Sequence, residues 1–271
     1  MLELGRRPLV MGILNITPDS FGESHPLDPR SAVDVALAIE AQGADLIDIG
    51  GESTRPGAEP VDAETELARI MPVLEGLKGR LRIPVSVDTY KAAVADRALE
   101  AGAQMVNDVS GLRYDPPLGE VVARRGAALV LMHTRGRSKN MYGKAEYGDV
   151  IGEVTSELQE SLDTAIRAGV PRTSILIDPG VGFAKRAAHS YGVLARLPEI
   201  GAALNRPVLV GPSRKSFLRA AAGGAEAPDR DWATAAAVTA AVLGGAHIVR
   251  VHAVAQMVQV VRAAEEIRLA R

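Results

Sequence analysis

The sequence predicts a single α/β domain over residues 1–271, folded as a (β/α)8 barrel, the TIM-barrel architecture. Eight short apolar segments alternate with longer helical stretches from one end of the chain to the other. The short segments lack a clear alternation of polar and apolar residues, which is typical of parallel strands buried on both faces. No low-complexity linker divides the chain. A doubly wound open sheet is the alternative arrangement of the same units.

The expected strands are short and rich in Val, Ile and Leu. They cover residues 9–15, 46–50, 84–88, 105–107, 128–132, 174–178, 208–211 and 247–251. The first helix has clear boundaries in the sequence, because Asp28 is a good N-cap and Pro29 suits the first helical position. Gly43 suits the position just past the end of that helix. Residues 136–148 are expected to form a long polar loop.

The composition excludes several classes of function. The formal net charge is −2 and the pI is near 6.2, so no basic face for nucleic acid is expected. The chain has no cysteine, which rules out disulfides, thiolate catalysis and cysteine-based zinc sites. No stretch resembles a signal peptide or a membrane span, so a cytoplasmic protein without membrane contact is expected.

Polar side chains lie at or near the end of every expected strand. In a barrel the carboxyl ends of the strands meet at one face, where active sites of this fold are found. One such residue is often only a helix cap, but polar residues at every strand end predict a functional site. They are Asn15, Asp48, Glu52, Asp88, Asn107, His133, Asp178, Ser213, Arg214, Lys215, Arg250 and His252.

These polar residues form two chemical groups. Short acceptors and amides (Asp88, Asn107 and Asp178) suit the edge of a flat heterocycle that carries N–H groups and ring nitrogens. The second group consists of donors that suit an oxyanion or a carboxylate, namely Arg55, Arg214, Lys215, Arg250 and His252. Together they favour a base-like substrate with an anionic group, and a reaction that displaces phosphate or diphosphate.

The motifs in which these residues lie resemble those of the dihydropteroate synthase family. The matches occur in the family's order and extend over roughly residues 9 to 265. They are NITPDSF at 15–21, GGESTRPG at 50–57, VDT at 87–89, NDVSG at 107–111, LMH at 131–133, DPGVGF at 178–183, GPSRKSF at 211–217 and RVH at 250–252. Each motif alone is moderately specific, whereas the ordered set is highly specific.

The resemblance implies that p-aminobenzoate displaces diphosphate from 7,8-dihydropterin-6-ylmethyl diphosphate to form 7,8-dihydropteroate, a step of folate synthesis. Asn15 matches the family's Mg²⁺ ligand, with diphosphate oxygens and water completing the coordination. The resemblance also implies roles for other residues: Asp88, Asn107, Asp178 and Lys215 hold the pterin, Met132 and Phe183 form apolar walls, Arg250, His252 and Thr54 face the diphosphate, and Phe21, Arg55, Pro56 and Ser216 form the p-aminobenzoate pocket. The catalytic residues are then expected to be Lys215, Arg250, His252 and Asp88.

Two departures from the family pattern stand out. After Phe21 the chain reads GESHP, where the family usually has an Asp-Gly-Gly turn, so the first loop is expected to be shorter. Ala184 precedes Lys185 where the family usually has Gly-Lys, which changes the freedom of the backbone but keeps the lysine. Neither departure falls on the residues implied for the pterin pocket.

Several polar or aromatic residues have simpler structural interpretations. Asp48 and Glu52 are expected to form hydrogen bonds with neighbouring backbone groups or with an arginine. His133 is either a packed hydrogen-bond donor or part of the site. Lys185, like Asp19, is expected in a solvated loop. Trp232, at the start of a helix, is expected to pack against the protein.

Two other functions compete with the main interpretation. One is a pterin-binding methyltransferase that uses methyltetrahydrofolate, whose domains lack the STRPG and SRKSF segments found here. The other is a non-catalytic homologue, which would have lost some of Asn15, Thr54, Arg55, Lys215, Arg250 and His252, all present in this chain. The resemblance also suggests a homodimer, for which the apolar segments 233–243 and 254–261 are the candidate interface.

Overall fold

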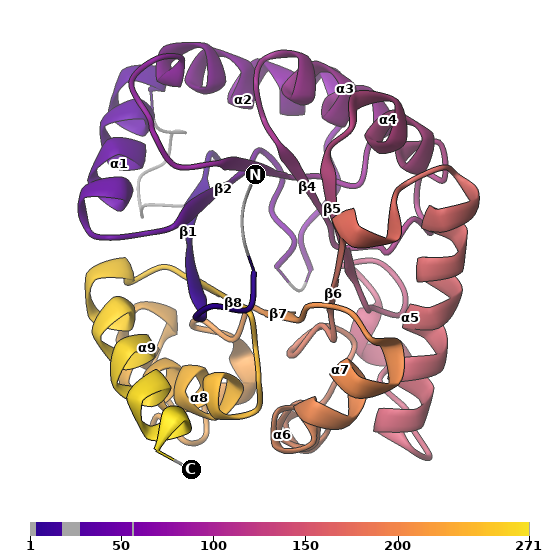
Figure 1. Cartoon of the computed structure of the whole chain (residues 1–271), viewed down its shortest axis with the longest axis vertical. Coiled ribbons are helices and arrows are strands. Elements are labelled where there is room, and N and C mark those ends of the chain that lie inside the picture. Colours follow the sequence, from indigo (N-terminus) through magenta and orange to yellow (C-terminus); the bar gives the residue numbers. More distant parts are fainter. Residues whose placement is uncertain (1–3, 18–27, 56, 271) are drawn as a thin grey trace.

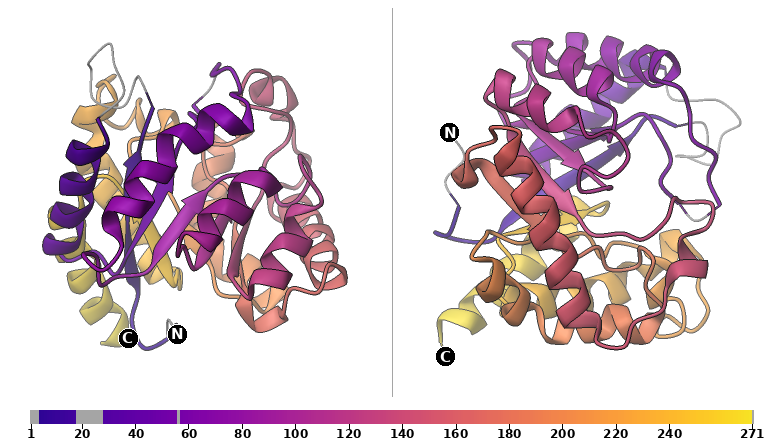
Figure 2. Two further views of the ribbon diagram at one scale, coloured as in Figure 1. Left: turned by 90° about the horizontal axis from the view of Figure 1, so that it is seen from above. Right: turned by 90° about the vertical axis from the view of Figure 1, so that its right-hand side faces the viewer.

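The structure, a computed structural model, describes residues 4–17, 28–55 and 57–270. Its centre is a ring of parallel strands, and the helices pack around the outside of that ring (Figure 1). The two side views in Figure 2 show the same arrangement. Among the described residues, no helix is long and apolar enough to cross a membrane.

The sheet has eight parallel strands in the order β6-β5-β4-β3-β2-β1-β8-β7. A parallel bridge between Ile177 and Val208 brings the two edge strands together. The predicted barrel is therefore confirmed, and the alternative of a doubly wound open sheet is excluded. The strands are β1 (Leu9–Asn15), β2 (Leu46–Gly50), β3 (Val85–Asp88), β4 (Met105–Asp108), β5 (Ala128–Met132), β6 (Ile175–Asp178), β7 (Leu209–Val210) and β8 (Ile248–Val251).

Helices follow the strands in alternation, with one addition. Two consecutive helices, α6 and α7, connect β6 to β7, so the outer layer departs from one helix per strand at that point. The helices are α1 (Pro29–Ala41), α2 (Ala63–Leu77), α3 (Ala92–Glu100), α4 (Leu118–Arg125), α5 (Val150–Arg167), α6 (Ala187–Ala195), α7 (Leu197–Leu204), α8 (Asp231–Leu243) and α9 (Val254–Leu269).

The boundaries of α1 agree with those predicted from the sequence. The carboxylate of Asp28 accepts hydrogen bonds from the backbone N–H groups of Arg30 at 2.9 Å and Ser31 at 3.3 Å. Pro29 is the first helical residue, and Gly43 has a φ of +96°, which favours glycine. The cap satisfies N–H groups that have no partner within the helix.

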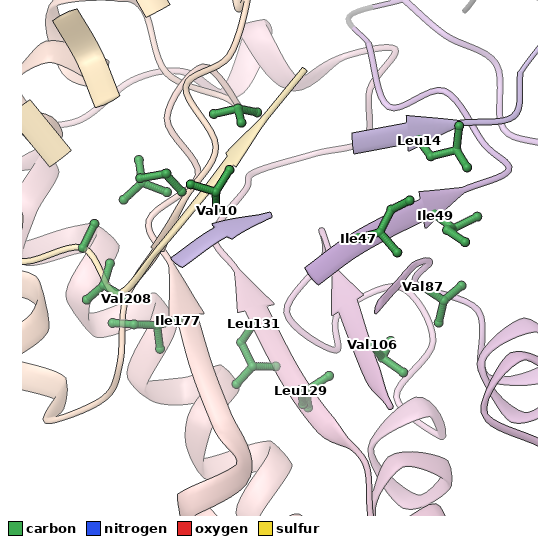
Figure 3. Packing of buried hydrophobic residues seen from close by; sticks show 14 of the residues in the cluster. Val10, Leu14, Ile47, Ile49, Val87, Val106, Leu129, Leu131, Ile177 and Val208 are labelled. Carbon is green, nitrogen blue, oxygen red and sulfur yellow. The ribbon is translucent and has the colours of Figure 1, made fainter. Parts of the chain in front are cut away.

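Two apolar layers account for the burial of the strands. The larger one lies between strands and helices, and Figure 3 shows some of its strand residues, including Val10, Ile47 and Val106. The smaller one contains buried residues from strands only, and therefore fills the interior of the barrel. Its members are Leu9, Met11, Leu46, Met105, Val130, Leu176, Leu209 and Ile248. Alternate strand residues thus point to different apolar layers, which explains why polar and apolar residues do not alternate in the sequence.

Trp232 does not pack as expected. It is the second residue of α8, and 90% of its surface is exposed. The helix instead buries Thr234, Ala237 and Val238 among its inward-facing residues. A residue in the first turn of a helix can project away from the face that packs, and this tryptophan does so in the single chain.

Candidate active site

The register of the sheet brings the predicted polar residues to one level at the barrel mouth. Asn15 pairs with Gly50, Gly50 with Asp88, and Asp88 with Asn107 across four adjacent strands. Gly50 separates the two side chains on either side of it. A Cβ at that position would lie 3.4 Å from Cβ of Asp88 and 3.5 Å from Oδ1 of Asn15. The glycine therefore leaves the space between this amide and this carboxylate open.

Arg250 connects the acids inside the mouth. Its Nε donates to Oδ2 of Asp48 at 2.6 Å and its Nη2 donates to Oδ2 of Asp88 at 2.7 Å. Asn107 donates to the same oxygen of Asp48 at 2.9 Å. Asp48 is therefore a structural acceptor for two of the predicted site residues, as the sequence suggested. Its other oxygen, Oδ1, is buried without a hydrogen-bond partner among the described residues.

Asp88 is poised to change its charge near neutral pH. Burial raises the pKa of Asp88 to about 7, the Arg250 guanidinium opposes this increase, and the negative charges of Asp48, Glu66 and Glu52 add to it. A carboxyl group with such a pKa at a barrel mouth is typical of a functional site.

Asp178 and Lys215 form the opposite side of the mouth. Oδ1 of Asp178 accepts from the backbone N–H of Gly180 at 2.7 Å, and burial raises the pKa of this carboxyl, with Lys215 opposing. Nζ of Lys215 donates to the carbonyl of Val181 at 2.7 Å and lies 4.2 Å from the centre of the Phe183 ring. Burial lowers the pKa of Lys215 to about 8, although the charge of Asp178 opposes that decrease. A carboxylate and a cation therefore lie beside an aromatic wall.

Met132 and Phe183 lie next to these polar groups. Met132 is the last residue of β5, pairs with Asp178 in the sheet and is 3% exposed. Gly180, between Asp178 and Phe183, has a φ of +67°. A Cβ on Gly180 would lie 1.9 Å from the carbonyl oxygen of His133, so no other residue fits there without a backbone shift. The DPGVGF segment thus lies directly against the end of β5.

Ser213 holds the imidazole ring of His252 in place. The backbone N–H of His252 donates to Oγ of Ser213 at 3.2 Å, and this hydroxyl is 2.9 Å from Nδ1 of the same histidine. The hydroxyl has two acceptor lone pairs and one proton, so it accepts from the backbone and pairs with Nδ1 in either direction; when it donates, the ring proton lies on Nε2. Burial, together with the charge of Arg250, lowers the pKa of His252 to about 3. The imidazole is therefore a neutral N–H donor.

The loop after β2 carries Thr54 and Arg55 and is attached to the loop after β5. The backbone N–H of Gly57 donates to the carbonyl of Ser138 at 3.0 Å, and Oγ of Ser138 donates to the carbonyl of Thr54 at 3.4 Å. Lys139 pairs with Glu59 in the same contact. Arg55 itself is exposed. Nothing in the sequence pointed to this attachment, because it joins two loops whose pairing depends on the closed barrel.

The other expected p-aminobenzoate residues are only partly described. Phe21 and Pro56 lie outside the described residues, as do Asp19 and the altered segment 22–26. Ser216 is exposed, and its Oγ lies 2.9 Å from the hydroxyl of Tyr142, which also donates to the carbonyl of Gly182 at 3.3 Å. The sequence did not single out Tyr142 as a neighbour of the site. Its place in the long loop gave no signal beyond its being aromatic.

The expectation for Lys185 was wrong. Lys185 is 1% exposed, not solvated, and its Nζ lies 2.7 Å from Nδ1 of His133. Ala184 has a φ of +44°, a left-handed conformation that turns the chain inward before the lysine. His133 is also fully buried, and its Nε2 lies 3.1 Å from Oε2 of Glu157. His133 is therefore a packed residue behind the mouth, one of the two interpretations that the sequence left open.

Two hollows on the surface of the described residues bear on the place of the site. One, of about 280 Å³, lies beside the mouth and is lined by Thr54, Phe183, Tyr90, Tyr114 and Arg137, among others. The other, of about 480 Å³, is lined by Leu197, Gly201, Val208 and His247, at the amino ends of β7 and β8. The larger hollow has none of the predicted site residues. We therefore place the chemistry at the carboxyl ends of the strands, where the titratable groups converge.

The residues at the mouth can bind Mg²⁺ only if a substrate supplies further ligands. Among the described residues no group of three His, Asp or Glu side chains could hold a metal ion. Asn15 offers one neutral amide oxygen at the end of β1, next to the open space over Gly50. Mg²⁺ commonly takes one or two protein ligands and completes its coordination with phosphate oxygens and water. The donors present therefore suit a Mg²⁺ ion that accompanies a diphosphate.

Comparisons with known proteins agree with this site. The sequence profile of the family described as pterin binding enzyme matches residues 11–252. Over 266 residues the chain is 44% identical to the dihydropteroate synthase of Synechocystis sp., covering 98% of this chain and 92% of that protein.

Solved structures of the same class superpose closely. A Clostridium difficile dihydropteroate synthase in the presence of pteroic acid has a TM-score of 0.92 and 39% identity, covering 98% of this chain and 99% of that chain. A Yersinia pestis dihydropteroate synthase in a sulfonamide drug complex has a TM-score of 0.92 and 39% identity, covering 97% of this chain and 95% of that chain.

The fold and the mouth define a barrel enzyme for a flat, polar and anionic substrate. The chain belongs to the pterin binding enzyme family, and its relatives place it among the dihydropteroate synthases. It is a transferase of that kind, and not the methyltransferase or the non-catalytic homologue considered above.

Proposed function

We propose that the barrel mouth holds 7,8-dihydropterin-6-ylmethyl diphosphate and p-aminobenzoate together, so that the arylamine displaces diphosphate. One observation carries this proposal: a pocket of acids and an amide, Asp88, Asn107 and Asp178, meets the cations Lys215 and Arg250 at one mouth. The pteroic acid in the Clostridium difficile structure, a pterin joined to an aminobenzoate, supports the same pair of substrates.

The pterin is proposed to lie between Asp178 and Lys215, with Asp88 and Asn107 at its edge. Oδ1 of Asp178 already accepts from Gly180, which leaves Oδ2 for the ring amino and N–H donors. The ammonium of Lys215 suits the acceptors of the ring. Met132 and Phe183 supply apolar contacts to its faces. Charge-assisted hydrogen bonds of this type are stronger than neutral ones, which gives the pocket its affinity.

The diphosphate is proposed to lie against Arg250 and His252, with Thr54 nearby. In the proposed complex Ser213 donates to Nδ1 of His252, so that the neutral imidazole presents its Nε2–H group to an oxyanion. In the proposed complex Nε of Arg250 keeps its hydrogen bond to Asp48. Its Nη2 becomes available to the diphosphate when Asp88 accepts from the pterin in place of Arg250. These donors face oxygens that gain charge as the C–O bond breaks, so they stabilise the transition state more than the bound substrate.

The chemistry requires no covalent intermediate on the protein. The electron-rich dihydropterin shares the positive charge left on the methylene carbon as diphosphate departs, so we expect a dissociative step. The arylamine is already nucleophilic and needs no general base. The four residues proposed as catalytic are Lys215 and Asp88, which hold the ring, and Arg250 and His252, which hold the leaving group.

Asn15 is the residue proposed to bind Mg²⁺. When bound with the diphosphate, Mg²⁺ supplies positive charge to the leaving group. We expect Asn15→Ala to raise the Mg²⁺ concentration needed for half-maximal rate and to lower turnover. Binding of a pterin that lacks diphosphate should stay at the parental level. A Mg²⁺ titration of the rate checks this, and unchanged Mg²⁺ dependence would mean that Asn15 has only a structural role.

p-Aminobenzoate is proposed to bind between the loops at the rim. Arg55 and Ser216 lie there in the described part of the chain, and Phe21 and Pro56 are the further residues carried over from the family motifs. The hydroxyl of Tyr142 lies 2.9 Å from Oγ of Ser216, and its single proton would have to leave the carbonyl of Gly182 to reach a bound carboxylate. A carboxylate between the guanidinium of Arg55 and the hydroxyl of Ser216 would be well matched.

A homodimer and a cytoplasmic location also remain proposals. Trp232, exposed at the start of α8 and directly before the apolar segment 233–243 expected at an interface, supports the dimer. Sedimentation of the parent and of Trp232→Ser tests it: a parental dimer that the substitution weakens is expected. A parent that sediments as a monomer at micromolar concentration would contradict it.

The function is tested by an assay of diphosphate release. With the pterin diphosphate and Mg²⁺ present, we expect release to depend on added p-aminobenzoate and to saturate with it. Arg250→Met, which removes both the guanidinium and its hydrogen bonds, is expected to abolish the dependence. Diphosphate release at the same rate with and without p-aminobenzoate would contradict the proposed function.

A further inference from the structure

Lys185 is a fully buried cation behind the active site, and the mechanism above does not use it. Its Nζ lies 2.7 Å from Nδ1 of His133, and 3.2 Å from each of the carbonyl oxygens of Gly180 and Phe183. A fourth contact, to the carbonyl of His133, is longer at 3.5 Å. Burial lowers the pKa of Lys185 well below its ordinary value, whereas the nearby charge of Asp178 opposes that decrease. Three acceptors surround Nζ, and this number matches the three hydrogens of the charged ammonium, so the contacts favour the charged form.

These contacts determine which nitrogen of His133 carries the proton. Nδ1 must accept from the ammonium, so the ring proton lies on Nε2, which faces Oε2 of Glu157 at 3.1 Å. Burial lowers the pKa of His133 to about 3, and the charge of Lys185 contributes to the decrease. The imidazole is therefore a neutral bridge between a buried cation and a carboxylate.

The outer end of this chain of contacts is attached to α5. Glu157 belongs to that helix, and Nε of Arg135 donates to its Oε1 at 2.9 Å. Partial burial opposes the ionisation of Glu157, but hydrogen bonds from His133 and Arg135 outweigh it and lower the pKa to about 2. The hydroxyl of Tyr147 donates to the carbonyl of Ala184 at 3.0 Å. The lysine is thus held in place from both sides.

The inner end holds the segment that faces the substrate. The carbonyls of Gly180 and Phe183 belong to the loop between Asp178 and Lys185. The backbone N–H of Gly180 in turn donates to Oδ1 of Asp178 at 2.7 Å, so a movement of Gly180 moves that carboxylate. Phe183 lies on Lys215 at the mouth. The ammonium therefore binds the loop at Gly180 and Phe183. Gly180 positions the carboxylate of Asp178, and Phe183 is the aromatic wall of the mouth.

We propose that Lys185 is a positioning residue, which fixes Asp178 and Phe183 for pterin binding by fastening the loop between β6 and α6 to His133. The proposal rests on the proposed function, because it takes Asp178 and Phe183 as contacts of the pterin. Buried polar networks of this kind rigidify their surroundings when every member is satisfied, and an uncompensated member is costly. The lysine acts through the loop and does not itself touch the substrate.

Lys185→Met tests the proposal, since methionine keeps an unbranched side chain that is one atom shorter and removes the ammonium. Calorimetry should show pterin binding about tenfold or more weaker than in the parent, as expected when a hydrogen bond to a charged group is misaligned. Amide exchange at residues 180–184 should become faster. Ile200→Ala serves as the control, because it removes a buried side chain from α7, which has no residue at the mouth. This control should lower the melting temperature and leave pterin binding within about twofold.

Nitrogen NMR of His133 in the unliganded parent gives an independent readout. The parent should show the Nε2–H tautomer, which donates to the carboxylate of Glu157, and in Lys185→Met the signal of Nδ1 should shift because it loses the hydrogen bond from the ammonium. Should Lys185→Met fail to fold, the parental tautomer still decides, because a proton on Nδ1 would overturn the proposal. Parental pterin affinity in a folded Lys185→Met protein would also overturn it. A parent that releases no diphosphate with p-aminobenzoate refutes the proposed function. In that case the tautomer of His133 and the amide exchange at residues 180–184 still decide whether Lys185 fastens the loop.

Discussion

At the scale of single residues, Asp178 has its two carboxylate oxygens in different surroundings. Oδ1 is fixed by the backbone N–H of Gly180, and the carboxyl is only 4% exposed. Burial raises the pKa of Asp178, and the nearby Lys215 opposes that increase. A buried acceptor with one oxygen already satisfied suits a ligand that brings its own donors.

We therefore expect Asp178→Asn to weaken pterin binding by roughly 2–3 kcal/mol, the cost of losing hydrogen bonds to a charged acceptor. The amide would present donors where the ring also has donors. Calorimetry measures the loss, and circular dichroism should show an unchanged fold. Asp62→Asn is a matched control, because Asp62 caps α2 and asparagine caps a helix equally well. Equal affinity in parent and Asp178→Asn would exclude Asp178 from the pocket.

The pH dependence of pterin binding follows from Asp88 and Lys215. In the free protein the pKa of Asp88 is raised to about 7, mainly by burial, so below that pH it is neutral and loses acceptor strength. Burial lowers the pKa of Lys215 to about 8, so above that pH it is neutral and loses a proton to donate. Affinity should therefore be highest between about pH 7 and pH 8, and should fall on both sides.

A titration of a dihydropterin at several pH values checks this profile. Lys215→Arg, which stays charged above pH 8, should remove the alkaline decrease and keep the acidic one. Because Asp88 and Lys215 both interact with Asp178 or Arg250, the two midpoints belong to the coupled cluster. A flat profile from pH 6 to pH 9 would contradict the roles given to Asp88 and Lys215.

At the scale of the elements, the strands change character along their length. Leu46, Met105 and Ile248 belong to the apolar interior of the barrel, and two residues later the same strands carry Asp48, Asn107 and Arg250 at the mouth. In a strand, residues two apart point to the same side. The interior of the barrel therefore changes from an apolar floor to a polar mouth within one repeat of the pleat.

This regularity explains how much of the site the sequence could predict. Polar residues at strand ends are visible in the sequence, so Asp88, Asn107, Asp178 and Arg250 could be placed at one mouth before the structure was known. The predicted strands agree with the observed ones to within a residue or two, because buried parallel strands are short apolar runs between helices.

The features that the sequence did not reveal depend on tertiary contacts. Lys185 was expected in water, since lysine is rarely buried without compensation. Its burial depends on Ala184 turning the chain inward and on three acceptors brought in from two strand ends. The contact of Ser138 with Thr54, and that of Tyr142 with Ser216, each join parts of the chain that are 74 or more residues apart. No local pattern encodes such pairs.

The loops around the mouth lead to a prediction about inhibitors. Arg55 is exposed, and its loop is held at Thr54 and Gly57 by the loop after β5. Diphosphate and Mg²⁺ would give Arg55 and Asn15 partners at the mouth, so the p-aminobenzoate pocket should be completed only when they are present. Closure would also exclude water from a reactive cation.

Sulfonamides should therefore bind weakly to the free protein and at least tenfold more tightly with pterin, Mg²⁺ and diphosphate present. Titration of one sulfonamide under both conditions measures the difference. Substitutions at Phe21 or Pro56 should weaken the drug more than p-aminobenzoate, because the bulkier drug reaches further against the loop. Equal sulfonamide affinity under both conditions would show that the pocket is preformed.

At the scale of the whole molecule, the residues that stabilise the barrel and the residues of the candidate active site lie in different parts of it. Apolar residues fill the barrel floor and the layer under the helices, while acids, amides and cations gather at the carboxyl ends of the strands. The pairing of β1 with β8 places the last strand beside the first two, so that Arg250 reaches Asp48 although the two residues are 202 positions apart in the chain. The site therefore exists only in the complete ring, which is why two substrates can meet within it.

The central claim is that one barrel mouth joins a pterin to an aminobenzoate. The most direct test supplies the purified chain with the pterin diphosphate, Mg²⁺ and isotope-labelled p-aminobenzoate, and measures both products by mass spectrometry. We predict labelled 7,8-dihydropteroate and diphosphate in equal amounts, with neither formed by Arg250→Met above the rate without protein. Diphosphate released without labelled dihydropteroate, or no turnover by a folded parent, would contradict the account.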